Sequence, residues 1–390
     1  MEVYLDHAAT TPVYPEVVEV MSDFLLNHFG NPSSLHHFGV DARGFLDKAR
    51  QQVADLINAQ PDQIYFTSGG TEADNIAVFG CALEKAAKEG KKHIITSGVE
   101  HHAILESCLE LRDHQGFDLT ILPVDKYGMV HPDTLREAMR DDTALVTIMH
   151  ANNEVGTVNP IKELAAVAHE RGAVFHTDAV QSVGKIECDV AELGVDMLTY
   201  SSHKINGPKG VGALYKKPDI QLYRRVFGGG QERKLRSGTE NMPGIVGFGK
   251  AAQITAGCWR QHAASWSKLR ESLVKGVLDT IPLTQLNGHP EKRLPHNANI
   301  SFDCIEGEAL LLYLNNAGIA CSSGSACSSG QAAASHVLTA MGLQGHMLSS
   351  GLRFTVGLGV TEEQIEYTLD IIRQKVDLLR AMSPFYKPAE

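Results

Sequence analysis

Short apolar runs rich in β-branched residues alternate with longer amphipathic runs from about Gln63 to Tyr215, and this alternation limits the possible fold more than any other feature. Apolar runs of this length are typical of strands buried in a sheet, and the amphipathic runs are typical of covering helices. The rhythm predicts an α/β fold with a mainly parallel sheet of about seven strands. The expected strands are Ile64–Thr67, His93–Thr96, Leu119–Leu122, Leu145–Met149, Val174–Thr177, Met197–Tyr200 and Val211–Tyr215. The expected helices are Glu72–Glu89, Ala103–His114 and Ile161–Arg171, with a short turn near Val190–Leu193.

The rhythm changes after Gly228–Gly230, which indicates a second, smaller α+β unit. Its expected elements are helices at Gly244–Thr280, Gly307–Asn315 and Thr361–Ala381 and strands near Asn299–Phe302 and Leu352–Val356. A chain of 390 residues exceeds the roughly 250–300 residues of a single core. We expect a large domain over residues 15–257 and a smaller domain formed by residues 1–14 and 258–390. The helix expected at Pro15–Asn27 should pack with the smaller unit, because chain ends often meet.

The charge and the cysteines exclude several classes of protein. The formal net charge is −11 and the basic residues are dispersed, which argues against direct binding of nucleic acid or of an anionic membrane. The N-terminus lacks the apolar core of a signal peptide and no apolar run approaches a membrane span, so we expect a cytoplasmic protein. The seven cysteines form no C-x-x-C pair, and the spacing of Cys321 and Cys327 is poor for zinc, so we expect no self-contained metal site.

The stretch Thr199–Gly210 places Lys204 in a polar, glycine-bearing turn directly after an expected strand. Ligands of open α/β sheets bind beyond the carboxyl ends of the strands. A single lysine in a turn is more often an ordinary surface residue. That interpretation weakens here because four other strand ends also deliver polar groups: Thr67–Glu72, Gly98–His102, Met149–Glu154 and Phe175–Gln181.

These groups match the needs of pyridoxal phosphate. A lysine amine forms the Schiff base, a carboxylate such as Asp178 keeps the pyridine nitrogen protonated, and an amide such as Gln181 can bond the ring hydroxyl. The glycine turn and helix start at Thr67–Glu72 can hold a phosphate. Each motif alone is weak evidence, and their joint order along the chain predicts the cofactor.

At this point the sequence resembles the cysteine desulfurases of the nitrogen-fixation and iron–sulfur-assembly type, within the class V aminotransferases of fold type I. The likeness extends from Tyr4–Pro12 and Gly30–Ser34 to Leu352–Gly357. Its most specific pieces are Ser202–Lys204, Arg236–Thr239 and Ser322–Cys327. The resemblance implies PLP-dependent conversion of L-cysteine to L-alanine, with the sulfur carried as a persulfide on Cys327.

The resemblance also implies a role for each matching residue. His101 would stack on the cofactor and shuttle protons, and Arg353 with Asn153 would bind the substrate carboxylate. The implied cofactor contacts are Lys204 as the Schiff base, Asp178 at the pyridine nitrogen, Gln181 and Asn153 beside the ring hydroxyl, and Gly70, Thr71, Ser201, His203 and Thr239 at the phosphate. Thr239 would come from a neighbouring subunit, which implies an obligate homodimer.

The stretch Ile319–Gly330 consists almost entirely of small residues around two cysteines, so we expect an exposed, mobile loop within about residues 319–333. Such a loop would let Cys327 visit the cofactor and then an outside acceptor. The resemblance to the long-loop group implies delivery to iron–sulfur scaffolds or tRNA-thiolation enzymes, where Cys327 could also be a transient iron–sulfur ligand. Cys321 could resolve the persulfide, form an adventitious disulfide or be inert.

Two other functions share this fold. A selenocysteine lyase or a class V aminotransferase would use the same cofactor, and a non-catalytic assembly subunit would keep only the fold and the interface. Cys327 argues against the aminotransferase, and the intact set of Lys204, Asp178 and His101 argues against the inactive subunit.

Overall fold

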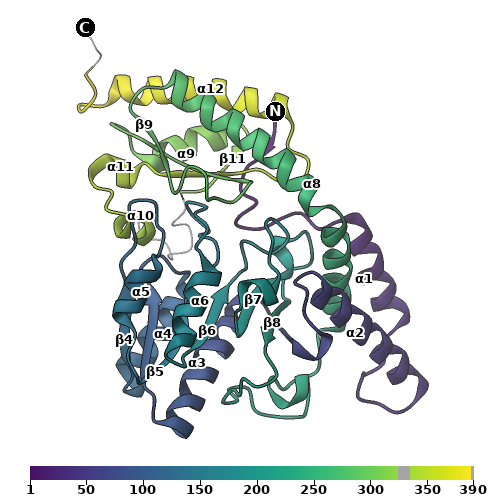
Figure 1. Ribbon diagram of the computed structural model, residues 1–390. Helices are drawn as coiled ribbons and strands as arrows, with labels where there is room; N and C mark the ends of the chain where they lie inside the picture. The colour runs from purple at the N-terminus through teal and green to yellow at the C-terminus, as the bar shows by residue number, and fades with distance from the viewer. Residues whose placement is uncertain (324–333, 388–390) are drawn as a thin grey trace.

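The computed structural model describes residues 1–323 and 334–387. Over these residues the chain forms two units joined by one long helix, α8 (Met242–Thr280), which runs diagonally between them in Figure 1. No helix among the described residues is long and apolar enough to cross a membrane.

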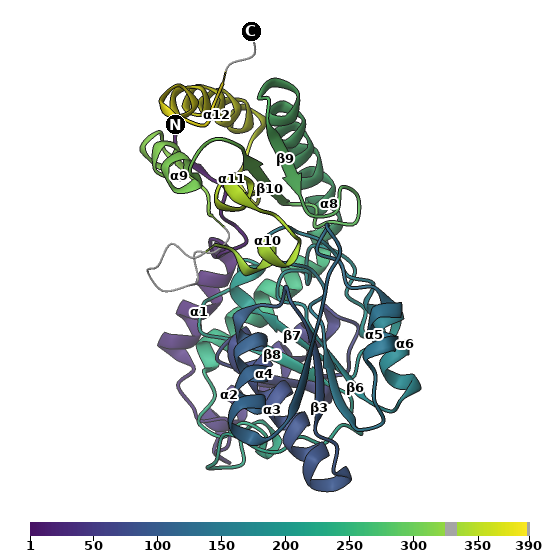
Figure 2. The same ribbon diagram turned by 90° about the vertical axis from the view of Figure 1, so that its left-hand side faces the viewer.

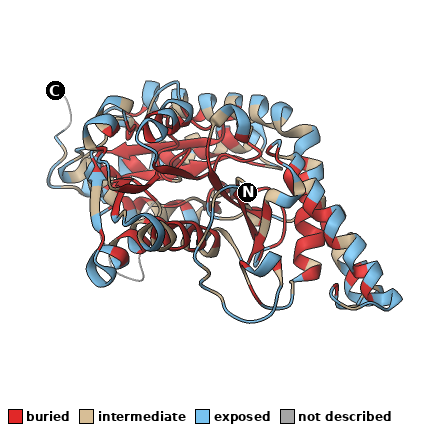
Figure 3. Ribbon diagram, turned by 60° about the horizontal axis from the view of Figure 1, so that its bottom comes forward, coloured by how far each residue is buried: buried red, intermediate tan, exposed pale blue. Residues whose placement is uncertain are grey.

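A seven-stranded sheet forms the centre of the larger unit. Its strand order is β2 (Ile64–Thr67), β8 (Gly212–Lys216), β7 (Met197–Ser201), β6 (Val174–Asp178), β5 (Thr143–Thr147), β3 (His93–Ser97) and β4 (Asp118–Leu122). Strand β8 is antiparallel to both of its neighbours, and the other pairs are parallel. Five central strands are buried along their whole length, as expected for a sheet covered on both faces, and Figure 3 shows this buried layer.

Helices surround this sheet on both sides (Figure 1). They are α1 (Pro15–Asn27), α2 (His37–Asp55), α3 (Gly70–Glu89), α4 (His102–Gln115), α5 (Pro132–Ala138), α6 (Ile161–Glu170) and α7 (Val190–Leu193). Three single 3-10 turns occur at η1 (Pro61–Gln63), η2 (Ser202–Lys204) and η3 (Glu232–Lys234).

The smaller unit lies above the sheet in Figures 1 and 2 and contains both ends of the described chain. Its antiparallel sheet has the order β12 (Leu352–Thr355), β10 (Asn297–Phe302) and β9 (Thr284–Asn287), and a parallel pair joins β1 (Val3–Tyr4) to β11 (Ile319–Ala320). Its helices are α9 (Gly307–Asn316), α10 (His336–Ala340), α11 (Gly345–Ser349) and α12 (Glu362–Met382).

Helix α8 contributes to the hydrophobic cores of both units. Ile245 and Phe248 in its first half are buried in the core of the larger unit, whereas Leu273 and Val277 in its second half are buried in the core of the smaller unit. The domain boundary predicted at residue 257 therefore falls within a continuous helix. The predicted division into residues 15–257 and residues 1–14 with 258–390 stays a prediction.

The predicted fold class is confirmed, and each predicted strand of the large sheet agrees with the structure within two residues. The predicted packing of Pro15–Asn27 is wrong. Val17 and Phe24 of α1 are buried in the core of the larger unit, where α1 packs on the first half of α8. The reason is that α1 carries an apolar face that matches this part of α8, and Met21 lies directly against Gly247.

The crossing of α2 and α8 depends on a glycine. A Cβ atom at Gly249 would lie 2.7 Å from Ala49 Cα and 2.8 Å from Ala49 Cβ, whereas a Cβ atom at Gly257 on the same helix would meet nothing within 4 Å. The first glycine thus permits close approach of the two helices, and the second serves no packing purpose.

We expect Gly249→Ala to destabilise the protein by about 1–2 kcal/mol, because overpacking outweighs the better helix propensity of alanine. Gly257→Ala should stabilise it by about 0.5–1 kcal/mol. Urea unfolding of the two variants beside the parent measures both effects, and equal stability of the two variants would contradict the packing argument.

Candidate active site

Six of the seven strands end at one edge of the large sheet. Strands β3, β4, β5, β6 and β7 are parallel, and β2 points the same way because β8 is antiparallel to both β2 and β7. The polar residues predicted after these strands therefore gather at a single edge, as the sequence predicts.

Lys204 lies in η2, the turn that directly follows β7. Its ammonium group donates hydrogen bonds to the main-chain oxygens of Ala8 (2.5 Å) and Ala9 (2.7 Å). Gln181 Nε2 also donates to the Ala8 oxygen, at 2.9 Å. The N-terminal segment thus crosses the sheet edge and places Lys204 beside Gln181.

Asp178 ends β6 and is buried. One of its oxygens accepts a hydrogen bond from the Val180 main-chain nitrogen at 2.9 Å. Burial raises the pKa of Asp178 to about 6, and the nearby charge of Lys204 acts in the opposite direction. Asp74, on α3, is also buried, and burial together with the charge of Asp178 raises its pKa well above the ordinary value. A cationic group bound at Asp178 would stabilise the ionised form of this buried carboxyl group.

His101 and Glu100 stand at the start of α4. His101 caps the helix, since its Nδ1 accepts a hydrogen bond from the Ala103 main-chain nitrogen at 3.2 Å. Burial, followed by the charge of Lys204, lowers the pKa of His101 to about 4. The ring is therefore neutral near pH 7, and because Nδ1 is an acceptor, its proton is on Nε2.

The start of α3 offers an anion site. Its N-cap residue, Gly69, provides no side-chain cap for the helix, so the first N–H groups at Gly70 and Thr71 are available to a ligand. Ser201 lies next to this turn, because a Cβ atom built on Gly70 would be 3.8 Å from the Ser201 Cβ. Ser201 Oγ is buried without a hydrogen-bond partner in the described structure.

The residues present fit pyridoxal phosphate. Besides the buried, unpartnered Ser201 Oγ at the helix start, Gln181 Oε1 is buried without a partner beside Lys204. These orphaned groups are those that a bound phosphate and a ring hydroxyl would satisfy. The buried carboxylate of Asp178 supplies the partner that a pyridinium nitrogen requires. His203, also predicted at the phosphate, has its Nδ1 3.2 Å from Thr10 Oγ1.

Arg353, on β12, lies at the boundary between the two units. Its Nη2 donates to Asp6 Oδ1 at 2.9 Å and its Nη1 donates to the main-chain oxygen of Asn153 at 2.8 Å. The Arg353 side chain is buried, and its Nε has no hydrogen-bond partner among the described residues. The structure thus brings Arg353 to Asn153, as predicted for a pair that binds one substrate.

One predicted residue within the described chain, Thr239, is not brought to this cluster. Thr239 is exposed and lines a small pocket with Thr67 and Ser68. Cys327 lies outside the described residues. Cys321 is described, and burial raises the pKa of its thiol to about 12, with Asp6 adding to the shift and Arg353 opposing it.

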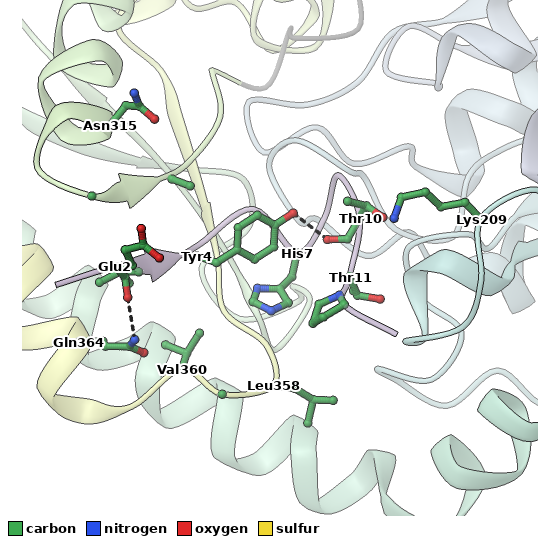
Figure 4. Close-up of a pocket in the computed structure, with 15 residues that line it drawn as sticks. Glu2, Tyr4, His7, Thr10, Thr11, Lys209, Asn315, Leu358, Val360 and Gln364 are labelled. Carbon is green, nitrogen blue, oxygen red and sulfur yellow. Dashed lines mark hydrogen bonds between the residues drawn. The ribbon is translucent and has the colours of Figure 1, made fainter. Parts of the chain in front are cut away.

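A pocket of about 740 Å³ lies along the N-terminal segment (Figure 4). Tyr4, His7, Thr10 and Lys209 are among the residues that line it, and Tyr4 donates a hydrogen bond to the Thr10 main-chain oxygen. Its lining residues do not include Lys204, and the carbonyl groups of Ala8 and Ala9 that bind Lys204 face the sheet edge instead. This pocket is therefore separate from the predicted cofactor site.

The sequence interpretation assigned no role to four residues that shape the site: Asp6, Asp74, Glu100 and Lys185. Lys185 is buried and its Nζ donates to the Lys204 main-chain oxygen at 3.1 Å, and burial followed by the charge of Lys204 lowers its pKa to about 7. The sequence could have indicated Asp74, because it lies four residues after Gly70 on the helix that starts at the anion site. No sequence feature indicates Asp6, since only the fold brings it to Arg353.

Comparison with known proteins gives a consistent result. The family model described as aminotransferase class-V matches residues 3–368. Cysteine desulfurase IscS of Methanosarcina thermophila is 49% identical, over 98% of this chain and 94% of the relative. Cysteine desulfurase IscS of Dictyoglomus turgidum is 48% identical, over 98% of this chain and 97% of the relative.

Solved structures agree with these relatives. A structure titled as a NifS-like protein superposes with a TM-score of 0.90 at 36% identity and covers 97% of this chain and 100% of that chain. A structure described as SspA in complex with cysteine has a TM-score of 0.80 at 35% identity and covers 91% of this chain and 98% of that chain.

Glu100 gives a test of the buried carboxylates that support the site. It accepts hydrogen bonds from Ser97 Oγ (2.5 Å) and from the Met149 main-chain nitrogen (3.0 Å), and burial raises its pKa from 4.5 to about 8. Between these pH values the folded protein binds more protons at this group than the unfolded chain does. The contribution of Glu100 to the free energy of unfolding therefore falls as the pH rises.

We expect the free energy of unfolding of Glu100→Gln, relative to the parent, to increase steadily from about pH 4.5 to about pH 8. Urea unfolding at several pH values measures this difference. The change Glu110→Gln, at an exposed position on α4, is the control and should show no such trend. A difference that is flat or falls with pH would show that Glu100 is ionised in the folded protein.

Proposed function

The chain belongs to the class-V aminotransferase family, and we propose that Lys204, Asp178, His101 and Cys327 together convert L-cysteine to L-alanine and an enzyme-bound persulfide. The protein is a cysteine desulfurase that depends on pyridoxal phosphate. The residue assignment rests mainly on one observation at the sheet edge. Lys204 and Gln181 both donate hydrogen bonds to the Ala8 carbonyl oxygen there.

Bound pyridoxal phosphate supplies an electron sink that weakens the Cα–H and Cβ–S bonds of the substrate. Lys204 would hold it covalently, and its amine, once released, would move the proton at the substrate Cα. Asp178 would keep the pyridine nitrogen protonated, and this cationic partner would stabilise its buried carboxylate. His101 is neutral, and its Nε2–H would donate a hydrogen bond to a group bound beside it.

Arg353 is proposed to bind the substrate carboxylate. Its guanidinium is fixed between the two units by Asp6 and by the Asn153 main-chain oxygen, and its Nε is left without a partner. A carboxylate that reaches Nε would add to these contacts or take the place of Asp6. Asp6 would then act as the counter-ion that keeps Arg353 oriented between turnovers.

Cys327 is proposed to receive the sulfur. Its thiolate sulfur would form a bond to the sulfur of the substrate while the Cβ–S bond breaks, and the carbon product would take up a proton and leave as alanine. Cys321 is the other candidate in the same stretch, but its raised pKa keeps it a protonated thiol near pH 7 and therefore a poor nucleophile.

We expect Cys327→Ser to reduce alanine formation from L-cysteine by at least about two orders of magnitude and to abolish the protein-bound persulfide. Cys321→Ser, the matched control, should keep both. Alanine is measured by amino-acid analysis and the persulfide by mass spectrometry of trapped peptides. If the Cys327→Ser variant formed as much persulfide as the parent, another cysteine would have to receive the sulfur.

The sulfur acceptor is proposed to be an iron–sulfur scaffold or a tRNA-thiolation enzyme in the cytoplasm, with Cys327 able to act as a transient ligand of a forming cluster. The cysteines support a reducing compartment, because all six that the structure describes are free thiols. Labelled persulfide on the protein, mixed with candidate acceptors, would identify which one receives the sulfur.

We propose further that the protein works as a homodimer through the tips of α1 and α2. Six large apolar side chains are exposed there: Leu25, Leu26, Phe29, Leu35, Phe38 and Val40. Leu35 is 96% exposed and Leu26 is 78% exposed, and Phe29 stacks on Phe38 with ring centroids 5.1 Å apart. An exposed apolar group of this size is typical of a surface that another chain covers.

A double change, Leu26→Ser with Leu35→Ser, should shift the protein from dimer to monomer without loss of secondary structure, because both side chains are solvent-exposed in the single chain. Leu312→Ser, at a side chain 63% exposed on α9, is the control and should leave the mass unchanged. Sedimentation equilibrium measures the mass. A double variant that stays dimeric would place the interface elsewhere.

A further inference from the structure

Three side chains with metal-binding atoms meet in the smaller unit, outside the group of residues that surrounds Lys204. One ligand atom each from Asp303, Cys304 and His346 lies within 4.8 Å of the other two. This is the one group of three such residues found among residues 1–323 and 334–387. The Cys304 main-chain nitrogen donates a hydrogen bond to Asp303 Oδ1 at 2.8 Å, and His346 Nδ1 lies 3.8 Å from the same oxygen.

Hydrogen bonds hold both segments that carry these side chains. Helix α11, which carries His346, is held to β10 by the hydrogen bonds from Ser301 Oγ to the Met347 oxygen (2.7 Å) and from the Phe302 nitrogen to Ser350 Oγ (3.0 Å). The turn that carries the other two ligands is fixed by Arg380, whose Nε donates to the Asp303 main-chain oxygen at 3.2 Å.

The cluster also has room for an ion and a further ligand. A pocket of about 240 Å³ is lined by Cys304, His346 and Glu306, together with Phe385. The His346 ring lies against Phe385 with ring centroids 4.5 Å apart, and Cys304 Sγ lies 3.5 Å from the Phe385 main-chain oxygen. The pocket therefore lies beside two of the three ligands, Cys304 and His346, and Phe385 near the C-terminal end of the described chain covers one side of them.

We propose that Asp303, Cys304 and His346 bind a zinc ion, with an exchangeable fourth position open to water or to Glu306. A set of one sulfur, one nitrogen and one carboxylate oxygen suits zinc, which takes four such ligands at about 2.0–2.3 Å in a tetrahedron. Ligand atoms around zinc are then about 3–4 Å apart, so only small side-chain rotations separate the observed spacing from a bound one. Binding releases the thiol proton of Cys304 to solvent and involves no oxidation or reduction.

This inference changes the interpretation of the cysteines and does not depend on the desulfurase reaction. The cysteine spacing in the sequence predicts no self-contained metal site, because Cys304 and His346 are separated along the chain and only the packing of α11 brings them together. Bound zinc would link the turn after β10 to α11, and α11 leads directly to β12, which carries Arg353.

The test uses the cofactor-loaded protein in a Cys327→Ser background, which removes the other thiol proposed to bind metals, and omits L-cysteine. After treatment with a chelator and titration with zinc, we expect one zinc per chain by elemental analysis and a higher melting temperature. Cys304→Ser and His346→Ala should each weaken zinc binding at least about tenfold. Zinc should also protect Cys304 from alkylation, as measured by peptide mass spectrometry.

The chain offers a matched control in Cys258 and His262, whose Sγ and Nδ1 atoms are 3.5 Å apart on α8. Cys258→Ser with His262→Ala should leave zinc binding unchanged, and zinc should not protect Cys258. The proposal is overturned if the parent binds no zinc or if Cys304 is alkylated at the same rate with and without it. If the variants do not fold, cobalt added to the parent keeps the test decisive, since the absence of a thiolate-to-cobalt absorption band would also refute the site.

Discussion

The common direction of six strands is the constraint on which the rest of the structure depends. Because β2, β3, β4, β5, β6 and β7 all point the same way, their carboxyl ends lie at one edge of the sheet. Residues separated by more than a hundred positions, such as Gly70 and Ser201, become neighbours there without any direct sequence signal. The smaller unit and the N-terminal segment then close this edge, and the closing contacts converge on Lys204 and Arg353.

The closed edge has an electrostatic cost. Asp74, Glu100 and Asp178 are carboxyl groups with raised pKa values, while His101 and Lys185 have lowered ones, and burial is the largest cause in every case. Each group is thus held closer to its neutral form than it would be in water. A bound cofactor with a phosphate and a pyridinium would bring compensating charges to both sides of this cluster, so the folded chain is prepared for a ligand at the expense of its own stability.

Local sequence patterns were enough to predict most of the fold and to indicate which polar residues meet at the sheet edge, while their individual roles stay predictions. The strands of the large sheet and the residues that follow them could be predicted because hydrophobic periodicity and turn residues are local signals. The packing of α1 could not, because α8 offers an apolar surface to both units and the sequence does not say which half binds α1. Asp6 and the carbonyl groups of Ala8 and Ala9 were missed for a related reason, since a main-chain acceptor has no side-chain signature.

The cysteines show how the surroundings of a thiol separate residues that look alike in the sequence. All six described cysteines have raised pKa values, with burial as the largest cause, and those of Cys81, Cys188 and Cys321 reach about 12. None of these six is therefore activated as a nucleophile by its protein surroundings. A desulfurase needs a thiolate to collect sulfur, and the raised pKa values of the six described thiols support the proposal that Cys327 takes this role. Burial and the charge of Asp303 raise the pKa of Cys304, and a bound cation would favour the loss of its proton.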